Sequence, residues 1–149
     1  MINKVLVVDS SVIMKWLNQN EEENIDKAEK LLKDFQDEKV QLIAPELAKY
    51  EVGNVLIYSK KLSSVQGQII LRHFYSLPIK YISETESLAF DTYEISLKLK
   101  ITYYDAAFIS LAKRYNASLV TDNPKHQKNT EDVKVIELKN YYNEFLGRG

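Results

Sequence analysis

Three carboxylates, Asp9, Glu51 and Asp105, are the residues of this 149-residue chain whose types and positions point to chemistry. Mg²⁺ and Mn²⁺ prefer oxygen ligands and keep water molecules that a phosphate group can replace. Carboxylates held close together repel one another unless a divalent cation neutralises their charge. Such a cation can activate water and stabilise the charge on a phosphate during in-line attack. A cluster of these acids therefore predicts metal-assisted phosphodiester hydrolysis.

The elements expected around the three acids would bring them to one edge of a sheet. The apolar run KVLVV (residues 4–8) predicts a strand buried on both faces, and it ends at Asp9. A second strand leads into the helix that carries Glu51, and Asp105 opens a helix that precedes another strand. Ligands of open parallel sheets bind beyond the carboxyl ends of the strands, so we expect the acids to meet there.

Each acid also has a simpler explanation. Asp9 would cap the helix that follows it, and Asp105 would complement the dipole of its helix as a first-turn acid. Glu51 lies beside the apolar stripe of its helix, where a carboxylate is costly unless it is paired. Its partner would then be Lys15 or Lys49 rather than a metal ion.

Strand-like and helix-like segments alternate along the whole chain, which predicts one α/β domain (residues 1–149) around a mostly parallel sheet. Gly53, inside one of these helices, is interpreted as a mark of close packing. The strands are expected at residues 4–8, 40–44, 79–82, 117–121 and 133–138, and the helices at 11–17, 24–35, 45–59, 63–75, 85–99, 104–115 and 139–145.

The composition excludes several other classes of protein. The chain has no cysteine, which rules out disulfides, thiolate zinc sites and cysteine nucleophiles. It has no G-x-S-x-G elbow, no phosphate loop and no dinucleotide-binding glycine pattern, and its two histidines lie far apart. No apolar run is long enough to span a membrane and no signal peptide is visible, so we expect a cytoplasmic protein. The net charge of −1 neither suggests nor excludes nucleic-acid binding.

Three segments, in this order and spacing, carry a family resemblance: VVDSSVIMKWL, APELAKYEVGNVL and YYDAAFISLAKRYNASLVT. Together they cover most of the chain, and they resemble the PIN-domain family, in particular its VapC-type toxin ribonucleases. The resemblance implies a three-layer α/β/α sandwich and Mg²⁺- or Mn²⁺-dependent cleavage of single-stranded or structured RNA. It also implies a toxin–antitoxin pair with a cognate antitoxin protein, and a homodimer.

Carried over residue by residue, the resemblance makes Asp9, Glu51 and Asp105 the catalytic, metal-binding acids. Ser11 matches the small hydroxyl residue that orients the first acid, and Thr121 matches the threonine that ends the following strand.

The match departs from the family pattern after Thr121. The family places an aspartate two residues later, where this chain has Asn123, and Asp122 is displaced by one position. Alternation along a strand favours Asn123 as the residue that faces the metal, whereas a bulge or early turn would favour Asp122.

Basic and aromatic residues near these motifs are candidates for RNA contacts. Lys15 would either contact a phosphate or form a flanking salt bridge, and Lys125 and Lys128 lie beside the Thr121 turn. Tyrosines such as Tyr104 would either stack on RNA bases or pack half-buried, and packing is the favoured interpretation.

Two other functions stay open at this level. A non-catalytic PIN-like module would use the same fold to hold RNA or a protein partner, with Asn123 as its only support. A phosphatase or a DNA nuclease would need a similar set of acids.

Overall fold

The computed structural model describes residues 4–127, 130 and 132–141. The strands are β1 (Lys4–Val8), β2 (Val40–Pro45), β3 (Ile79–Ile82), β4 (Ser118–Thr121) and β5 (Val135–Glu137). The α-helices are α1 (Ser10–Leu17), α2 (Ile25–Gln36), α3 (Leu47–Asn54), α4 (Ser64–Ser76), α5 (Glu86–Leu99) and α6 (Tyr103–Arg114). A short π-helical segment (Val55–Ser59) continues α3, and 3₁₀ turns occur at Pro124–His126 and Leu138–Asn140.

The five strands form one sheet in the order β3-β2-β1-β4-β5, and every pair of neighbours is parallel. β1 lies in the centre, where Leu6 pairs with Leu42 of β2 and Val7 pairs with Leu119 of β4. The sequence expectation of a mostly parallel sheet is confirmed.

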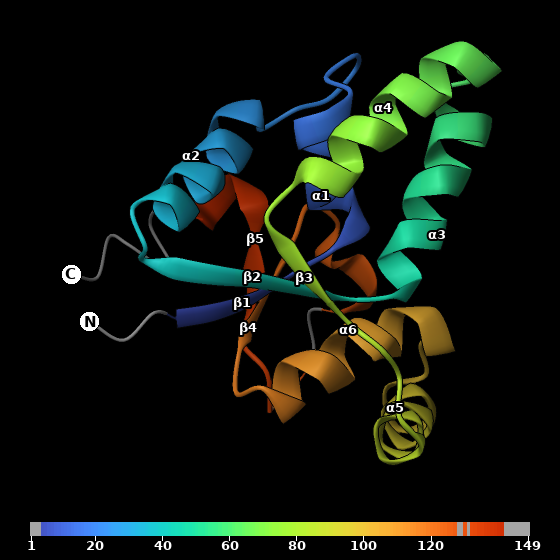
Figure 1. Ribbon diagram of the computed structural model, residues 1–149. Helices are drawn as coiled ribbons and strands as arrows, with labels where there is room; N and C mark the ends of the chain where they lie inside the picture. Colours follow the sequence, from blue (N-terminus) through green and yellow to red (C-terminus); the bar gives the residue numbers. More distant parts are fainter. Residues whose placement is uncertain (1–3, 128–129, 131, 142–149) are drawn as a thin grey trace.

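Helices cover both faces of this sheet, which gives the expected three-layer α/β/α arrangement (Figure 1). In the view of Figure 1, α1 to α4 lie above the strands, and α5 and α6 lie below them. The helix α6 packs against β1, β2 and β4, while α5 packs on α6. The three acids belong to segments that leave or adjoin the central strands.

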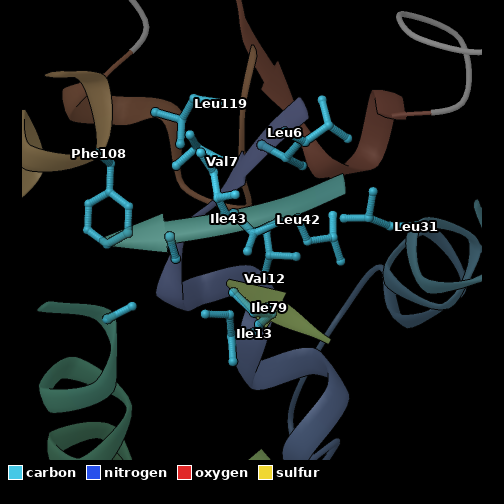
Figure 2. Close-up of a cluster of buried hydrophobic side chains, with 14 of the residues drawn as sticks. Leu6, Val7, Val12, Ile13, Leu31, Leu42, Ile43, Ile79, Phe108 and Leu119 are labelled. Carbon is cyan, nitrogen blue, oxygen red and sulfur yellow. The ribbon is translucent and has the colours of Figure 1, made fainter. Parts of the chain in front are cut away.

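The core explains why these segments fold as they do. Leu6 and Val7 are fully buried, as expected for a strand that is covered on both faces. Figure 2 shows side chains of α1, α2 and α6, such as Ile13, Leu31 and Phe108, meeting those of the strands in one cluster. Amphipathic helices thus bury their apolar stripes against a sheet that has no polar face.

Three local expectations need correction. The helix expected over 45–59 begins later, because Pro45 is the last residue of β2, and it ends in a π-helical turn. A side chain added at Gly53 would meet nothing within 4 Å, so close packing does not explain this glycine. The final helix expected over 139–145 starts as a 3₁₀ turn, and the rest of that range lies outside the described residues. No helix in the described ranges has both the length and the apolar character of a membrane span.

Candidate active site

The strand order places a topological switch point at the carboxyl end of β1, between β1 and β4; the region where the three acids lie there is called the crevice below. The chain passes from β1 to β2 on one side, while β4 pairs with β1 on the other side. Such a reversal of strand order leaves a gap between the connections, and it is where open α/β sheets bind ligands. Asp9 follows β1 directly, Thr121 is the last residue of β4, and Glu51 lies on the helix that follows β2.

Asp9 is oriented by two hydroxyl groups. Thr121 Oγ1 donates a hydrogen bond to Asp9 Oδ2 at 2.6 Å, and Ser11 Oγ donates to the same oxygen at 3.2 Å. Although Asp9 is the N-cap residue of α1, its side chain accepts no capping hydrogen bond. The capping explanation for Asp9 is therefore wrong, and its carboxylate faces the neighbouring strand end.

Glu51 lies half-buried on α3 and accepts a hydrogen bond of 2.7 Å from Ser10 Oγ. Neither lysine considered as its partner pairs with it: Lys49 binds Glu46 at 3.0 Å, and Lys15 binds other carboxylates. The salt-bridge explanation for Glu51 is therefore wrong.

Asp105 lies in the first turn of α6, which begins at a conventional cap. Thr102 Oγ1 accepts a hydrogen bond of 3.0 Å from the backbone N–H of Asp105, which fixes this turn. Gln127 Nε2 donates to the backbone carbonyl of Asp105 at 3.4 Å, so the segment after β4 also holds the turn.

The three acids influence one another's protonation. Burial raises the pKa of Asp9, and the negative charge of Asp105 raises it further, against the opposite effect of the hydroxyl donors. Burial also raises the pKa of Glu51, with smaller contributions from the charges of Asp9 and Asp105. Among the described residues, no basic side chain forms an ion pair with any of the three. Within this described part of the chain, no basic side chain therefore compensates their negative charge.

This donor set suits a hard divalent cation. Within residues 4–127, 130 and 132–141, no three His, Asp or Glu side chains converge closely enough to form a finished metal site. The three acids offer only oxygen atoms and are partly buried, and none of them pairs with a basic side chain in the part of the chain that the structure describes. Oxygen donors of this kind are the ligands that Mg²⁺ and Mn²⁺ prefer, so the chemistry of these residues fits such an ion.

Asp122 and Asn123 lie differently at the turn after β4. Asp122 is tied by its side chain to Lys15 at 2.8 Å and to Asn24 at 3.2 Å. Its backbone N–H donates to Ser11 Oγ at 3.0 Å. Asn123 is exposed, and its backbone N–H donates to Thr121 Oγ1 at 3.0 Å. The turn therefore supports Asp9 through Ser11 and Thr121 while the Asp122 carboxylate is engaged elsewhere.

Lys15 forms the centre of an ion-pair network behind the acids. Its side chain is buried, with only 3% of the residue exposed, and it binds Glu22 and Asp122 at 2.8 Å each. Lys60 binds the same Glu22 at 2.5 Å. The ammonium group of Lys15 thus faces carboxylates rather than solvent. Of the other candidates for RNA contacts, Lys125 is exposed, and Lys128 lies outside the described residues.

Two contributors to the site were not predicted from the sequence. Ser10 donates to Glu51, although only Ser11 was expected to act as an orienting hydroxyl. Gln127 contacts the first turn of α6 across 22 positions of sequence. The adjacent serines at the end of β1 were a visible signal for Ser10, whereas nothing in the sequence pattern marks Gln127.

The family model of the PIN domain matches residues 6–132 of this sequence. The chain belongs to the PIN domain family. This match runs from within β1 past the end of β4 and includes Asp9, Glu51 and Asp105. No curated protein matches the sequence at a significant level.

Several solved structures share the fold of this chain at low sequence identity. VapBC2 from Rickettsia felis, bound to a DNA fragment from its promoter, aligns with a TM-score of 0.68 and 20% identity over 89% of this chain and 98% of that one. PAE2754 from Pyrobaculum aerophilum gives the same TM-score and identity over 97% and 96%. VapC20 from Mycobacterium tuberculosis, a toxin that cleaves the sarcin-ricin loop, gives 0.59 and 11% over 76% and 85%.

Proposed function

We propose that this PIN domain is a Mg²⁺- or Mn²⁺-dependent endoribonuclease of the VapC type, the toxin of a toxin–antitoxin pair. The observation that carries the proposal is the set of Asp9, Glu51 and Asp105 at the strand crossover, with raised pKa values for two of them and no basic partner among the described residues. A module that only binds a partner has no use for uncompensated, partly buried carboxylates. The similarity to a toxin that cleaves an RNA loop agrees with an RNA substrate.

The residues of the crevice have distinct parts in this function. Asp9, Glu51 and Asp105 would hold the ion, which when bound supplies an activated water and neutralises charge on the phosphate. Thr121 and Ser11 orient the Asp9 carboxylate, and Ser10 orients that of Glu51. Asn123 offers a neutral oxygen at the exposed side of the turn, and Lys125 is an exposed cation that would contact the RNA backbone.

The test is a direct comparison of substrates. Wild-type protein is incubated with single-stranded RNA, single-stranded DNA and a phosphomonoester, each with Mg²⁺, with Mn²⁺ and with EDTA. We expect internal cleavage of RNA only when a metal ion is present, and loss of cleavage in Asp105→Asn because one ligand is removed. Wild-type activity of Asp105→Asn in Mg²⁺ would show that the site is misplaced. Hydrolysis of the phosphomonoester without cleavage of RNA or DNA would show that the protein is a phosphatase and not a nuclease.

The partners proposed with this function are an antitoxin and a second copy of the chain. Solved neighbours include a toxin–antitoxin complex from Klebsiella pneumoniae and a DNA-bound VapBC from Salmonella typhimurium. Expression of this chain alone should arrest growth, and co-expression with the product of a small neighbouring reading frame should relieve the arrest. Sedimentation of the purified chain should give twice the monomer mass. Expression of the active protein without growth arrest would contradict the toxin–antitoxin proposal. A monomer at all concentrations would contradict the proposed dimer.

A further inference from the structure

A cavity of about 240 Å³ lies between the first turns of α3 and α6, next to α5 and the end of β3, on the two helices that carry Glu51 and Asp105. Its apolar wall contains Leu47, Ile82, Leu88 and Ala107. It is separate from the crevice itself, because none of Asp9, Glu51 and Asp105 lines it.

Two exposed tyrosines connect this cavity to the acids. Tyr50 and Tyr104 line it, with 75% and 60% of each residue exposed to solvent. Tyr50 directly precedes Glu51, and Tyr104 directly precedes Asp105. Successive helix residues are rotated by about 100° around the axis, so each tyrosine lies on the face next to that of its acid. Both helices therefore present an aromatic ring to the cavity and a carboxylate to the adjoining crevice.

The polar groups of the cavity accept hydrogen bonds and carry negative charge. Glu46 and Glu84 line it; Glu46 also pairs with Lys49 at 3.0 Å through one of its oxygens, and Tyr103 donates a hydrogen bond of 2.6 Å to Glu84 Oε1. Hydrogen bonding to this carboxylate raises the pKa of Tyr103 to about 12, so its hydroxyl stays protonated. Carboxylates repel a phosphate but accept hydrogen bonds from the amino groups of a nucleobase. An apolar wall, two exposed rings and acceptor groups together suit a base and not a sugar–phosphate segment.

We infer that this cavity is the subsite for one unstacked nucleobase of the RNA, next to the phosphate that is cleaved, with Tyr50 and Tyr104 as its stacking surfaces. The inference rests on the proposed ribonuclease function. Aromatic stacking accepts any base, while the acceptors Glu46 and Glu84 favour adenine, cytosine and guanine, which carry exocyclic amino groups, over uracil. The subsite thus adds a base preference at one position to a site that otherwise holds phosphate.

The test uses a short single-stranded RNA that contains 2-aminopurine, whose fluorescence is quenched by stacking. Binding is measured in Ca²⁺ and in EDTA for wild type, Tyr50→Ala, Tyr104→Ala and Tyr104→Phe, and cleavage is measured in Mg²⁺. The control is Tyr58→Ala, since Tyr58 is also 75% exposed but does not line the cavity. Because all three tyrosines are exposed, we expect the variants to melt like wild type, which circular dichroism checks.

We expect quenching by wild type, and a loss of affinity and cleavage of roughly tenfold or more in the two alanine variants. Tyr104→Phe should restore both, and Tyr58→Ala should change neither. Replacing the amino-bearing base by uracil should weaken binding to wild type and have little effect in Glu84→Gln, because the amide can also donate to uracil carbonyls.

The outcomes separate this inference from the function on which it rests. If wild type cleaves RNA and the alanine variants equal it, the base subsite is wrong and the nuclease stands. If wild type binds with tyrosine-dependent quenching but never cleaves, the base subsite stands and the nuclease is wrong. If the alanine variants change the sedimenting mass while RNA affinity is unchanged, the cavity is an interface between copies and the inference is overturned.

Discussion

At the scale of single residues, the carboxylates of the candidate site differ from most partly buried acids because, among the described residues, no lysine or arginine pairs with them. Asp9 and Glu51 receive hydrogen bonds from hydroxyl groups, which orient a carboxylate without neutralising its charge. A lysine at the same places would stabilise the fold but occupy the acids. On the proposed function, the three acids would keep their charge available for a cation, at a cost in stability when no cation is bound.

That cost predicts the effect of Asp105→Asn on stability. In EDTA, the variant should have the same unfolding temperature as wild type or a higher one. Its free energy of unfolding should exceed that of wild type by up to about 1 kcal/mol, because one repelling charge is removed. The control is Asp91→Asn. In wild type, the Asp91 carboxylate pairs with Arg114 at 2.6 Å, so this variant should have the same free energy of unfolding as wild type or a slightly lower one. Calorimetry measures both. A clear loss of stability in Asp105→Asn would mean that its charge is compensated.

The raised pKa values also predict how stability depends on pH. A carboxylate whose folded-state pKa lies above its unfolded value binds a proton more tightly when folded, so acidification through that interval stabilises the fold. Without metal, the contributions of Asp9 and Glu51 should therefore rise as the pH falls from neutral toward 4.5, the ordinary pKa of Glu51. Glu22, with a lowered pKa, opposes this only below its own ordinary value of 4.5.

With Mn²⁺ present the sign should reverse, because the ion binds only the deprotonated acids and its affinity falls on acidification. Thermal unfolding across this pH interval, in EDTA and in Mn²⁺, gives the two slopes. Equal slopes in the two conditions would argue against a shared metal site at these acids.

At the scale of elements, the network around Lys15 joins α1, the α1–α2 connection and the turn after β4. Replacing Lys15 by methionine leaves Asp122 and Glu22 without a buried partner, although Lys60 still binds Glu22. We expect Lys15→Met to lower the free energy of unfolding by about 1–3 kcal/mol. Lys33→Met, which breaks an exposed pair with Asp37, should cost under about 0.5 kcal/mol. Urea titration of both variants measures their free energies of unfolding. Equal losses in the two variants would show that Lys15 does not stabilise the turn after β4.

The turn after β4 yields a separate prediction for its two polar residues. Because the Asp122 carboxylate binds Lys15 and Asn24, Asp122→Ala should lower the unfolding temperature and leave the affinity for Mn²⁺ nearly unchanged. Asn123→Asp should tighten Mn²⁺ binding, since it adds a charge at an exposed position beside Thr121. Titration calorimetry with Mn²⁺ and thermal unfolding separate the two effects. Strong loss of Mn²⁺ affinity in Asp122→Ala would instead place Asp122 in the site.

Most elements could be predicted from the sequence because their patterns depend on local physics. β1 is a continuous apolar run, and a strand covered on both faces requires one. The sequence around Pro45 is typical of a helix start, whereas the structure makes it the last residue of β2, where it pairs with Ile82 of β3. Such choices depend on a neighbour distant in sequence, which periodicity does not contain.

The site divides in the same way. The candidate acids were visible in the sequence for different reasons, because Asp9 follows a strand, Asp105 lies in a first turn and Glu51 lies beside the apolar stripe of its helix. The partner of Lys15 could not be predicted, because Asp122 and Glu22 approach it only after the sheet has formed. The expectation that Tyr104 packs half-buried is wrong. Tyr104 is exposed, and its ring lies at the cavity.

At the scale of the whole molecule, the proposed function predicts that metal binding and folding are linked. Millimolar Mg²⁺ or Mn²⁺ should raise the unfolding temperature, because an ion that binds only the folded state stabilises it by mass action. Ca²⁺ should also raise it yet support little cleavage, since its looser coordination positions water poorly. Differential scanning fluorimetry with each ion checks this, and Asp9→Asn should lose the shift. The absence of any shift with Mn²⁺ would favour a non-catalytic binding module.

The sheet ends on both sides in very short strands, and this restricts how the molecule can associate. β3 has four residues and β5 has three, and both are outermost in the sheet. Unpaired backbone groups at an edge can recruit a strand from another chain, and short edges offer few of them. Lys80, exposed on β3, adds a charge that disfavours such an addition. Extension of the sheet from one copy to the next, and with it assembly into open-ended β-fibres, is therefore disfavoured.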